Sequence, residues 1–325
     1  MDKTAATIAT AAAAEGERSL RDAPIFVVGS PRSGTHLLRF CLSQHPRIYI
    51  CPETAFFFQV YGNRKLIPES TISENVEKLF NKLYRSGDPT MREFDYLREE
   101  LTARVANEVT TYSQFAETVL AAFAAAKGKE RWGEKTPLHS LYLQQIFELF
   151  PSSRVLMLNR SPKNVIASYV KSSHLPNDFY KGAAECYLCY TAGRRFADKI
   201  HQVSYDDLTC QPEQTLRAIC DYIGEEFDPR MLSPGMVDSS YNNEAMKFSS
   251  DIGILPENPD KWKAVLTDHQ AEFVDYLFGE GSTSFSPRYL FDLLKFSRTK
   301  LRHAISAYKN SLGYENIVRY RRGIW

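Results

Sequence analysis

The sequence lacks long apolar runs, is poor in cysteine and has almost no net charge, and each absence excludes a class of protein. No run reaches the roughly eighteen apolar residues that a membrane-spanning helix needs, so no such helix is expected. Six cysteines in 325 residues are too few for a disulfide framework, and we expect reduced thiols and a cytoplasmic location. A net charge of +1 is not typical of nucleic-acid-binding proteins, which usually have a strong basic excess.

The two ends of the chain differ in composition from the part between them. Residues 1–22 are rich in alanine and contain few strong hydrophobic residues, so we interpret them as a disordered tail rather than a signal peptide. Residues 295–325 contain eight Lys or Arg residues and a single acid, Glu315, and we expect this basic segment to pack on the domain or extend from it. Its charge suits either a solvated helical face or a weak contact with anionic surfaces.

Residues 24–54 contain an apolar strand, a loop bounded by two glycines, a helix and a second strand. Ile25–Val28 is a run of apolar residues, which is typical of a buried parallel strand. Gly29 and Gly34 bound the loop, and a helix is predicted over Thr35–Gln44. Backbone N–H groups and the helix dipole attract anions at such a place, so the sequence predicts a phosphate-binding loop.

This loop differs from that of the nucleotide triphosphatases in the residues that handle phosphate and magnesium. Their pattern has Lys and then Ser or Thr after the second glycine, whereas Thr35 and His36 follow Gly34 here. A cation lies inside the loop instead, because Arg32 stands between the glycines. Asn159, at the end of a predicted strand, also replaces the aspartate that would hold magnesium. We therefore expect a phosphate-bearing cofactor that is bound without a metal.

The remaining segments alternate between strand and helix patterns, which predicts an α/β fold with a P-loop-like parallel sheet flanked by helices. The length favours one domain, residues 23–294, over two small ones. Residues 59–131 have helical spacing and are interpreted as an insertion that faces the acceptor. Pro52 turns the chain so that Glu53 emerges at the carboxyl end of its strand, where open parallel sheets bind ligands. Further strands are predicted over residues 48–51 and 154–158, and helices over 139–150, 179–200, 212–223 and 261–277.

Taken together, these segments resemble the sulfotransferases that use 3′-phosphoadenosine 5′-phosphosulfate (PAPS). Residues 29–35 are similar to the family's 5′-phosphosulfate loop, and residues 154–168 are similar to its 3′-phosphate element. Gly133–Pro137 resembles the segment that carries a lysine, and Val203–Leu208 resembles a later strand and helix start. The tyrosylprotein and bacterial branch is the most similar, because Arg32 stands where cytosolic-type members usually have Lys.

The resemblance implies an enzyme that moves a sulfuryl group from PAPS to an acceptor hydroxyl or amine by in-line transfer, with no metal. The product of the donor is 3′-phosphoadenosine 5′-phosphate (PAP). Glu53 is implied as the general base, and Arg32 and Lys135 as catalytic cations. The implied cofactor-binding residues are Arg32, Ser33, Gly34, Thr35, His36, Arg160, Ser168, Tyr205, Ser249, Ser250 and Lys261.

Several alternatives stay open at this point. Glu53 also suits an ion pair with Arg32 or a helix cap, and Tyr205 also suits a buried strand. The C-x-x-C of Cys186 and Cys189 favours helix packing over zinc binding, since no second ligand pair accompanies it. A P-loop kinase and a binding protein without chemistry are the alternative functions, and the acceptor is a saccharide, a small molecule or a peptide. The histidines interpreted as structural or acceptor-lining rather than catalytic are His36, His45, His139 and His174.

Overall fold

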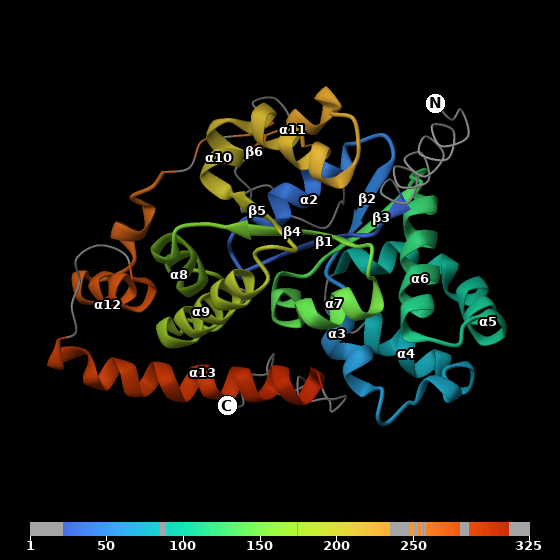
Figure 1. Ribbon diagram of the computed structural model, residues 1–325, viewed down its shortest axis with the longest axis horizontal. Helices are drawn as coiled ribbons and strands as arrows, with labels where there is room; N and C mark the ends of the chain where they lie inside the picture. Colours follow the sequence, from blue (N-terminus) through green and yellow to red (C-terminus); the bar gives the residue numbers. More distant parts are fainter. Residues whose placement is uncertain are drawn as a thin grey trace, which may run out of the picture.

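A five-stranded parallel sheet lies at the centre of the chain, in the order β2-β3-β1-β4-β5 (Figure 1). The predicted α/β class with helices on both sides of a parallel sheet is confirmed. The strands are β1 (Ile25–Gly29), β2 (Ile48–Cys51), β3 (Arg131–Lys135), β4 (Arg154–Asn159) and β5 (His201–Ser204). The computed structural model describes residues 22–84, 89–173, 175–234, 248–249, 253–254, 256, 258–279 and 286–311.

Strand β3 lies between β1 and β2, although apolar patterning does not predict a strand there. Three of its five residues are charged, and all five are buried. The side chain of Arg131 donates to Ala23 O and to Glu225 Oε1, which compensates its charge. At Gly133, an added Cβ would lie 2.4 Å from Ile50 Cδ1, so glycine lets the neighbouring strand pack closely. Buried polar contacts therefore help to hold this strand in the sheet.

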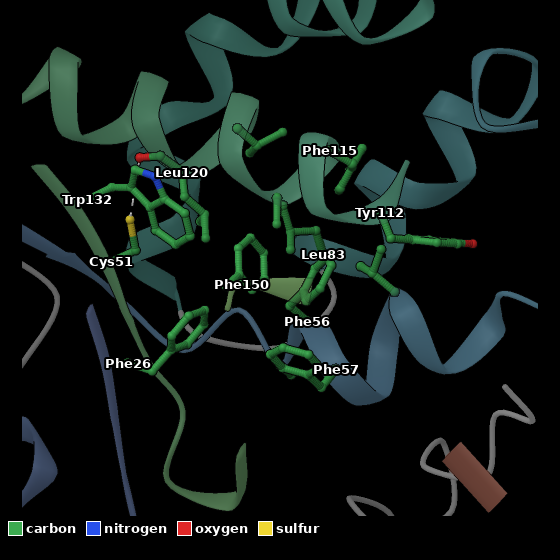
Figure 2. Close-up of a cluster of buried hydrophobic side chains, with 14 of the residues drawn as sticks. Phe26, Cys51, Phe56, Phe57, Leu83, Tyr112, Phe115, Leu120, Trp132 and Phe150 are labelled. Carbon is green, nitrogen blue, oxygen red and sulfur yellow. Dashed lines mark hydrogen bonds between the residues drawn. The ribbon is translucent and has the colours of Figure 1, made fainter. Parts of the chain in front are cut away.

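Alternate side chains of the strands pack into two separate cores. On one face, Ile25 and Val27 pack against α2 (Thr35–Ser43) and α11 (Pro212–Ile223). On the other face, Phe26 joins an aromatic cluster with Trp132 and Phe150, with ring centroids 5.9 and 5.4 Å from its own. Figure 2 shows this cluster between the sheet and the helices of the insertion. The sheet is thereby covered on both faces, and its ligands must approach at the ends of the strands.

The segment between β2 and β3 is largely helical and packs against the second core. Helix α6 lies against β2 and β3, and a capping box of Thr111 and Gln114 fixes its start. The α-helices of this segment are α3 (Phe56–Gln59), α4 (Val76–Tyr84), α5 (Arg98–Glu108) and α6 (Tyr112–Ala126). Its 3-10 helices are η1 (Tyr61–Asn63), η2 (Glu69–Thr71), η3 (Ser73–Asn75) and η4 (Pro89–Leu97).

Two of the helical ranges predicted after β3 are each divided into a 3-10 helix and an α-helix. The range 139–150 becomes a 3-10 helix, η5 (Pro137–Tyr142), followed by α7 (Leu143–Leu149). The range 261–277 becomes η8 (Lys261–Ala264) and α12 (Asp268–Phe278), because Thr267 and Gln270 form a capping box. The remaining elements are α8 (Pro162–Val170), α9 (Phe179–Arg195), α10 (Tyr205–Cys210), η6 (Pro229–Leu232), β6 (Phe248–Ser249), β7 (Gly253–Ile254), η9 (Pro287–Tyr289) and α13 (Leu290–Ser311).

A third core joins α8, α9, α12 and α13 on one side of the molecule (Figure 1). Helix α13 is the longest of these, with 22 residues, and its inner face packs on α9 and α3. Across the described ranges, no helix combines the length and apolar character that crossing a membrane requires.

Candidate active site

The parallel topology brings four predicted segments to one edge of the sheet. The glycine-bounded loop follows β1, Glu53 lies two residues after β2, Lys135 ends β3 and Arg160 follows β4. These four strands are neighbours in the sheet, so their carboxyl ends lie side by side. This edge is where open α/β sheets bind ligands.

The loop between β1 and α2 has backbone conformations that favour a close fit. Arg32 has a φ of 73°, in the left-handed region that non-glycine residues seldom adopt, and Gly34 has a φ of 103°. A Cβ on Gly34 would lie 2.2 Å from Cδ2 of Tyr205, so the loop rests directly on that ring. Helix α2 then begins at Thr35 without an acidic residue in its first turn. The positive end of its dipole is therefore open to an anion.

Two arginines and two serines meet beside this loop. Arg32 Nε donates to Ser168 Oγ at 3.2 Å, and Arg160 Nη1 donates to Arg32 O at 2.9 Å. The Arg160 guanidinium also stacks on the Tyr205 ring, with its carbon 4.5 Å from the ring centroid. Ser33 Oγ is buried and has no hydrogen-bond partner among the described residues. A buried hydroxyl and two guanidiniums thus converge on one place.

The charges at this place are not neutralised by an ion pair at Arg32. Burial, and next the neighbouring charge of Arg160, lower the pKa of Arg32, whereas Glu53 raises it. In the described part of the chain, Arg32 has no carboxylate within ion-pair distance. Two cations held close together in this way favour binding of an anion with several oxygens. Phosphate groups therefore fit the hydrogen-bond donors at this place, which are the loop amides, Ser33, Arg32 and Arg160.

A second cluster lies at the ends of β2 and β3 and consists of Glu53, Lys135 and His36. Lys135 Nζ donates to Glu53 Oε1 at 2.8 Å and lies 3.0 Å from His36 Nε2. His36 Nε2 is 3.5 Å from Glu53 Oε1. The Lys135 side chain is fully buried, while 27% of the Glu53 side chain is exposed. The alternatives to a general base were an ion pair with Arg32 and a helix cap. Glu53 does form an ion pair, but its partner is Lys135 rather than Arg32.

The cluster keeps Glu53 ionised and His36 neutral. Burial raises the pKa of Glu53, but Lys135 and His36 outweigh it and hold that pKa well below its usual range. Burial and then Lys135 lower the pKa of His36 to about 4. Neutral His36 accepts a hydrogen bond from the Lys135 ammonium, which positions that cation between a ring and a carboxylate.

Stability is expected to fall as pH drops from about 6.5 to about 4, because folding lowers the pKa of His36 across this window. Between these values the unfolded chain binds a proton that the folded chain excludes, which favours unfolding. Glu53 adds a further loss below its unfolded pKa of about 4.5. Denaturant midpoints of the wild-type chain and of His36→Asn measure the effect. The denaturant midpoint of His36→Asn should change less with pH than that of the wild-type chain. An equal change in both proteins would contradict the assignment of His36 as the group that titrates.

The segment that carries Glu53 is held by a buried network around Glu134. Glu134 Oε1 accepts hydrogen bonds from the backbone N–H and the hydroxyl of Thr54 at 3.2 and 2.9 Å, and from the Thr136 hydroxyl. Glu134 Oε2 lies 2.9 Å from His139 Nδ1, while His139 Nε2 accepts from the Phe57 N–H. Nδ1 is therefore the protonated nitrogen and donates to Glu134. Glu134 and Thr136 flank Lys135 in the sequence, and in the structure they fix the turn that follows Glu53.

Glu134→Gln is expected to destabilise the protein by about 1–3 kcal/mol, the usual result of leaving buried polar groups unsatisfied. An amide has one oxygen, so its NH2 group must face either the Thr54 and Thr136 donors or His139 Nδ1–H. Denaturant unfolding of the wild-type chain and of the variant measures the difference. Equal stability of the two proteins would contradict the assignment of this network as the support of the turn after Glu53.

The other predicted residues lie on neighbouring elements or fall outside the described residues. Thr35 is buried at the start of α2, and Tyr205 begins α10 rather than lying in a strand. Lys261 is exposed on η8, which is tied to α8 by a hydrogen bond from Trp262 N to Asn164 Oδ1. The remaining predictions fall outside the described residues: Ser250, His174 and the side chain of Ser249.

A cavity of about 240 Å³ opens between the loop, the end of β4 and helix α9. Ser30, Ser33 and Arg160 line one side, and Cys186 and Cys189 line the other. Both thiols are buried, and within the described ranges no three His, Cys, Asp or Glu side chains gather as a metal site. The cavity belongs to the same site as the arginine pair.

Comparison of the sequence with known proteins identifies the family of this chain. The sequence model of the sulfotransferase family matches residues 24–229, which is more than half of the chain. Protein-tyrosine sulfotransferase A of Caenorhabditis elegans is 24% identical over 263 residues, covering 75% of this chain and 62% of that protein. Nodulation protein NoeE of Sinorhizobium fredii is 24% identical over 151 residues, covering 46% of this chain and 32% of that protein. The chain thus spans less than two thirds of the length of these relatives.

Two solved structures have a similar fold. The sulfotransferase domain of a Synechococcus olefin synthase has a TM-score of 0.56 at 21% identity and covers 79% of this chain and 94% of its own. The sulfotransferase domain of the curacin biosynthetic pathway has a TM-score of 0.51 at 19% identity and covers 80% and 98%. With the family match over residues 24–229 and the shared fold, the chain belongs to the sulfotransferase family.

Proposed function

We propose that the chain transfers a sulfuryl group from PAPS to an acceptor hydroxyl or amine. The observation that carries this proposal is the ionised Glu53, paired with buried Lys135, at the strand ends that adjoin the arginine-bearing loop. A base, cations and an anion-binding loop are the groups that such a transfer needs. Family membership favours this reaction over the kinase and over a binding protein without chemistry.

The residues beside the loop would hold the donor. When bound, PAPS supplies the phosphosulfate anhydride from which the sulfuryl group leaves. The loop amides and the Ser33 hydroxyl suit the 5′-phosphate, because Ser33 Oγ is buried without a partner among the described residues. Arg160 and Ser168 suit the 3′-phosphate, and Arg32, hydrogen-bonded to Ser168, lies between the two elements. Thr35 and His36 stand where nucleotide triphosphatases have the Lys and the Ser or Thr that handle phosphate and magnesium, so we propose binding without magnesium.

Arg32 and Lys135 would stabilise the negative charge that develops on the leaving phosphate oxygen. Lys135 is buried and needs an anionic partner, which Glu53 provides in this structure. Any anion that draws the Lys135 ammonium away from Glu53 raises the pKa of the carboxylate toward its usual range. Glu53 would then accept the acceptor's proton more readily as the acceptor oxygen or nitrogen attacks the sulfur in line.

The acceptor would approach from the side of the helical insertion. Helix α3 starts three residues after Glu53, so residues 59–131 continue directly from the proposed base. One relative is named for protein tyrosine, one solved domain belongs to an olefin synthase, and another belongs to the curacin biosynthetic pathway. Tyrosine peptides, saccharides and small alcohols are therefore the acceptors to screen with labelled PAPS.

Thermal unfolding with nucleotides tests the donor assignment. PAP should raise the unfolding temperature in the presence of EDTA, since a ligand at 100 times its Kd stabilises by about 2.7 kcal/mol. Mg-ATP in place of PAP should give no comparable shift. Stabilisation by Mg-ATP alone would contradict the proposal and favour the kinase.

A further inference from the structure

The outer face of α13 carries an apolar stripe that the third core does not use and that Arg298 interrupts. Apart from the adjacent Leu290 and Phe291, successive stripe residues lie three, four or seven positions apart, so they follow one side of the helix. Each has between 44% and 63% of its surface exposed. The stripe consists of Leu290, Phe291, Leu294, Leu301, Ile305 and Tyr308. The inner face of the same helix packs on α9 and α3, and Figure 1 shows α13 at the edge of the molecule.

Basic residues accompany this stripe, and acidic residues do not. Lys295, Arg298, Arg302 and Lys309 are exposed on the same helix. Its one acid, Asp292, is buried and accepts hydrogen bonds from the Tyr180 hydroxyl at 2.6 Å and from His269 Nε2 at 3.0 Å. The outer face of α13 is therefore apolar and positive, and the helix's own residues Leu290–Ser311 contribute no exposed carboxylate to it.

We propose that α13 docks on an anionic membrane surface, with the stripe in the interface and the basic residues on lipid headgroups. An amphipathic helix with apolar residues on one face and Lys or Arg beside them binds such interfaces without spanning the bilayer. Each basic residue near a negative surface adds to the attraction. This inference is independent of the proposed function, since it rests only on the exposed face of α13.

The charge pattern favours a membrane over a second copy of the chain. In a helix pair formed by this face, Arg298 would occupy the position between Leu294 and Leu301 in the apolar seam. Like charges from Lys295 and Arg302 would flank that seam in both copies, and the outer face has no acid to pair with them. A headgroup layer supplies the missing negative charge.

Vesicle sedimentation of the full chain tests the docking. Vesicles of phosphatidylcholine with phosphatidylserine should bind the protein, vesicles of phosphatidylcholine alone should bind it much less, and added salt should weaken binding. Leu294→Gln with Leu301→Gln should lower the partition coefficient at least about tenfold, since both leucines lose apolar contact with the interface. Arg298→Gln with Arg302→Gln should lower it roughly fivefold for each residue.

Matched substitutions on other exposed surfaces serve as controls. Leu66→Gln replaces a leucine that is 70% exposed, and Arg104→Gln removes an exposed cation, so both should leave vesicle binding unchanged. Unfolding temperatures should show that all variants fold. The proposal is overturned if the wild-type chain does not bind vesicles that contain phosphatidylserine. It is also overturned if the α13 variants bind these vesicles as strongly as the wild-type chain. A dimer that Leu294→Gln with Leu301→Gln dissociates would overturn it too, because a second copy would then cover the stripe.

Discussion

Replacing Glu53 by glutamine is expected to lower kcat roughly 100- to 10,000-fold, the usual effect of removing a general base. Glutamine keeps the size and a hydrogen-bond acceptor for Lys135 but cannot take the acceptor's proton. PAP affinity should stay equal or increase, because the variant loses a negative charge near the anion-binding loop. Turnover with labelled PAPS and calorimetric binding of PAP measure the two effects separately.

Lys135 gives this experiment a further readout. In Glu53→Gln the buried ammonium loses its carboxylate, so the ligand-free variant should be less stable than the wild-type chain. PAP should then stabilise the variant more than it stabilises the wild-type chain, since its phosphates would replace the lost partner. Glu93→Gln is the matched control, because Glu93 pairs with Lys127 at 2.7 Å and has a similar exposure but lies outside the site. Normal turnover in Glu53→Gln, or loss of PAP binding, would refute the assignment of Glu53 as the base.

Replacing Arg160 by methionine is expected to weaken PAP binding by about 2–4 kcal/mol, the usual range for removing one member of a charged hydrogen-bonded contact. That corresponds to roughly 30- to 700-fold in Kd. Methionine retains an apolar chain over the Tyr205 ring but loses the guanidinium and its hydrogen bond to Arg32 O. Titration calorimetry of both proteins with PAP gives the ratio.

Comparison with adenosine 5′-monophosphate shows which phosphate Arg160 holds. This nucleotide lacks the 3′-phosphate, so the substitution should change its affinity much less than that of PAP. Arg154→Met is the control, since Arg154 lies at the other end of β4 and also stacks on a tyrosine, Tyr222. Equal losses for both nucleotides would place Arg160 at the 5′-phosphate or in support of the loop. An unchanged PAP affinity would remove Arg160 from the donor site.

The two variants probe separate halves of the site that topology brings together. Arg160 follows β4, on one side of β1, and Glu53 follows β2, beyond β3 on the other side. Arg32, in the loop after β1, lies between them and responds to both charges. A substitution that weakens PAP binding but leaves proton transfer to Glu53 intact therefore affects the Arg160 half of the site. A substitution that lowers turnover but leaves PAP binding intact affects the Glu53 half.

Local patterns predicted the parts of the fold whose signal is contained in a few adjacent residues. The apolar run Ile25–Val28 and the glycines of the following loop indicate a buried strand and an anion-binding turn, because both depend on short-range geometry. The same patterns do not reveal β3, whose Arg131, Glu134 and Lys135 look like surface residues. Their burial depends on partners far along the chain, such as Glu225 for Arg131.

The amino-acid sequence alone shows which chemical groups the site has: a loop with a cation, a carboxylate after a strand and a lysine in a short motif. How these groups pair depends on the three-dimensional fold. The insertion of β3 next to β2 places Lys135 against Glu53, so Glu53 pairs with Lys135 rather than with the alternative partner Arg32, and Arg32 contacts Ser168. The positive φ of Arg32 and the hold of Glu134 on the Glu53 turn depend in the same way on contacts between distant segments. Two charged or hydrogen-bonding groups interact when they are close in space. Their separation along the chain does not show whether the fold brings them close.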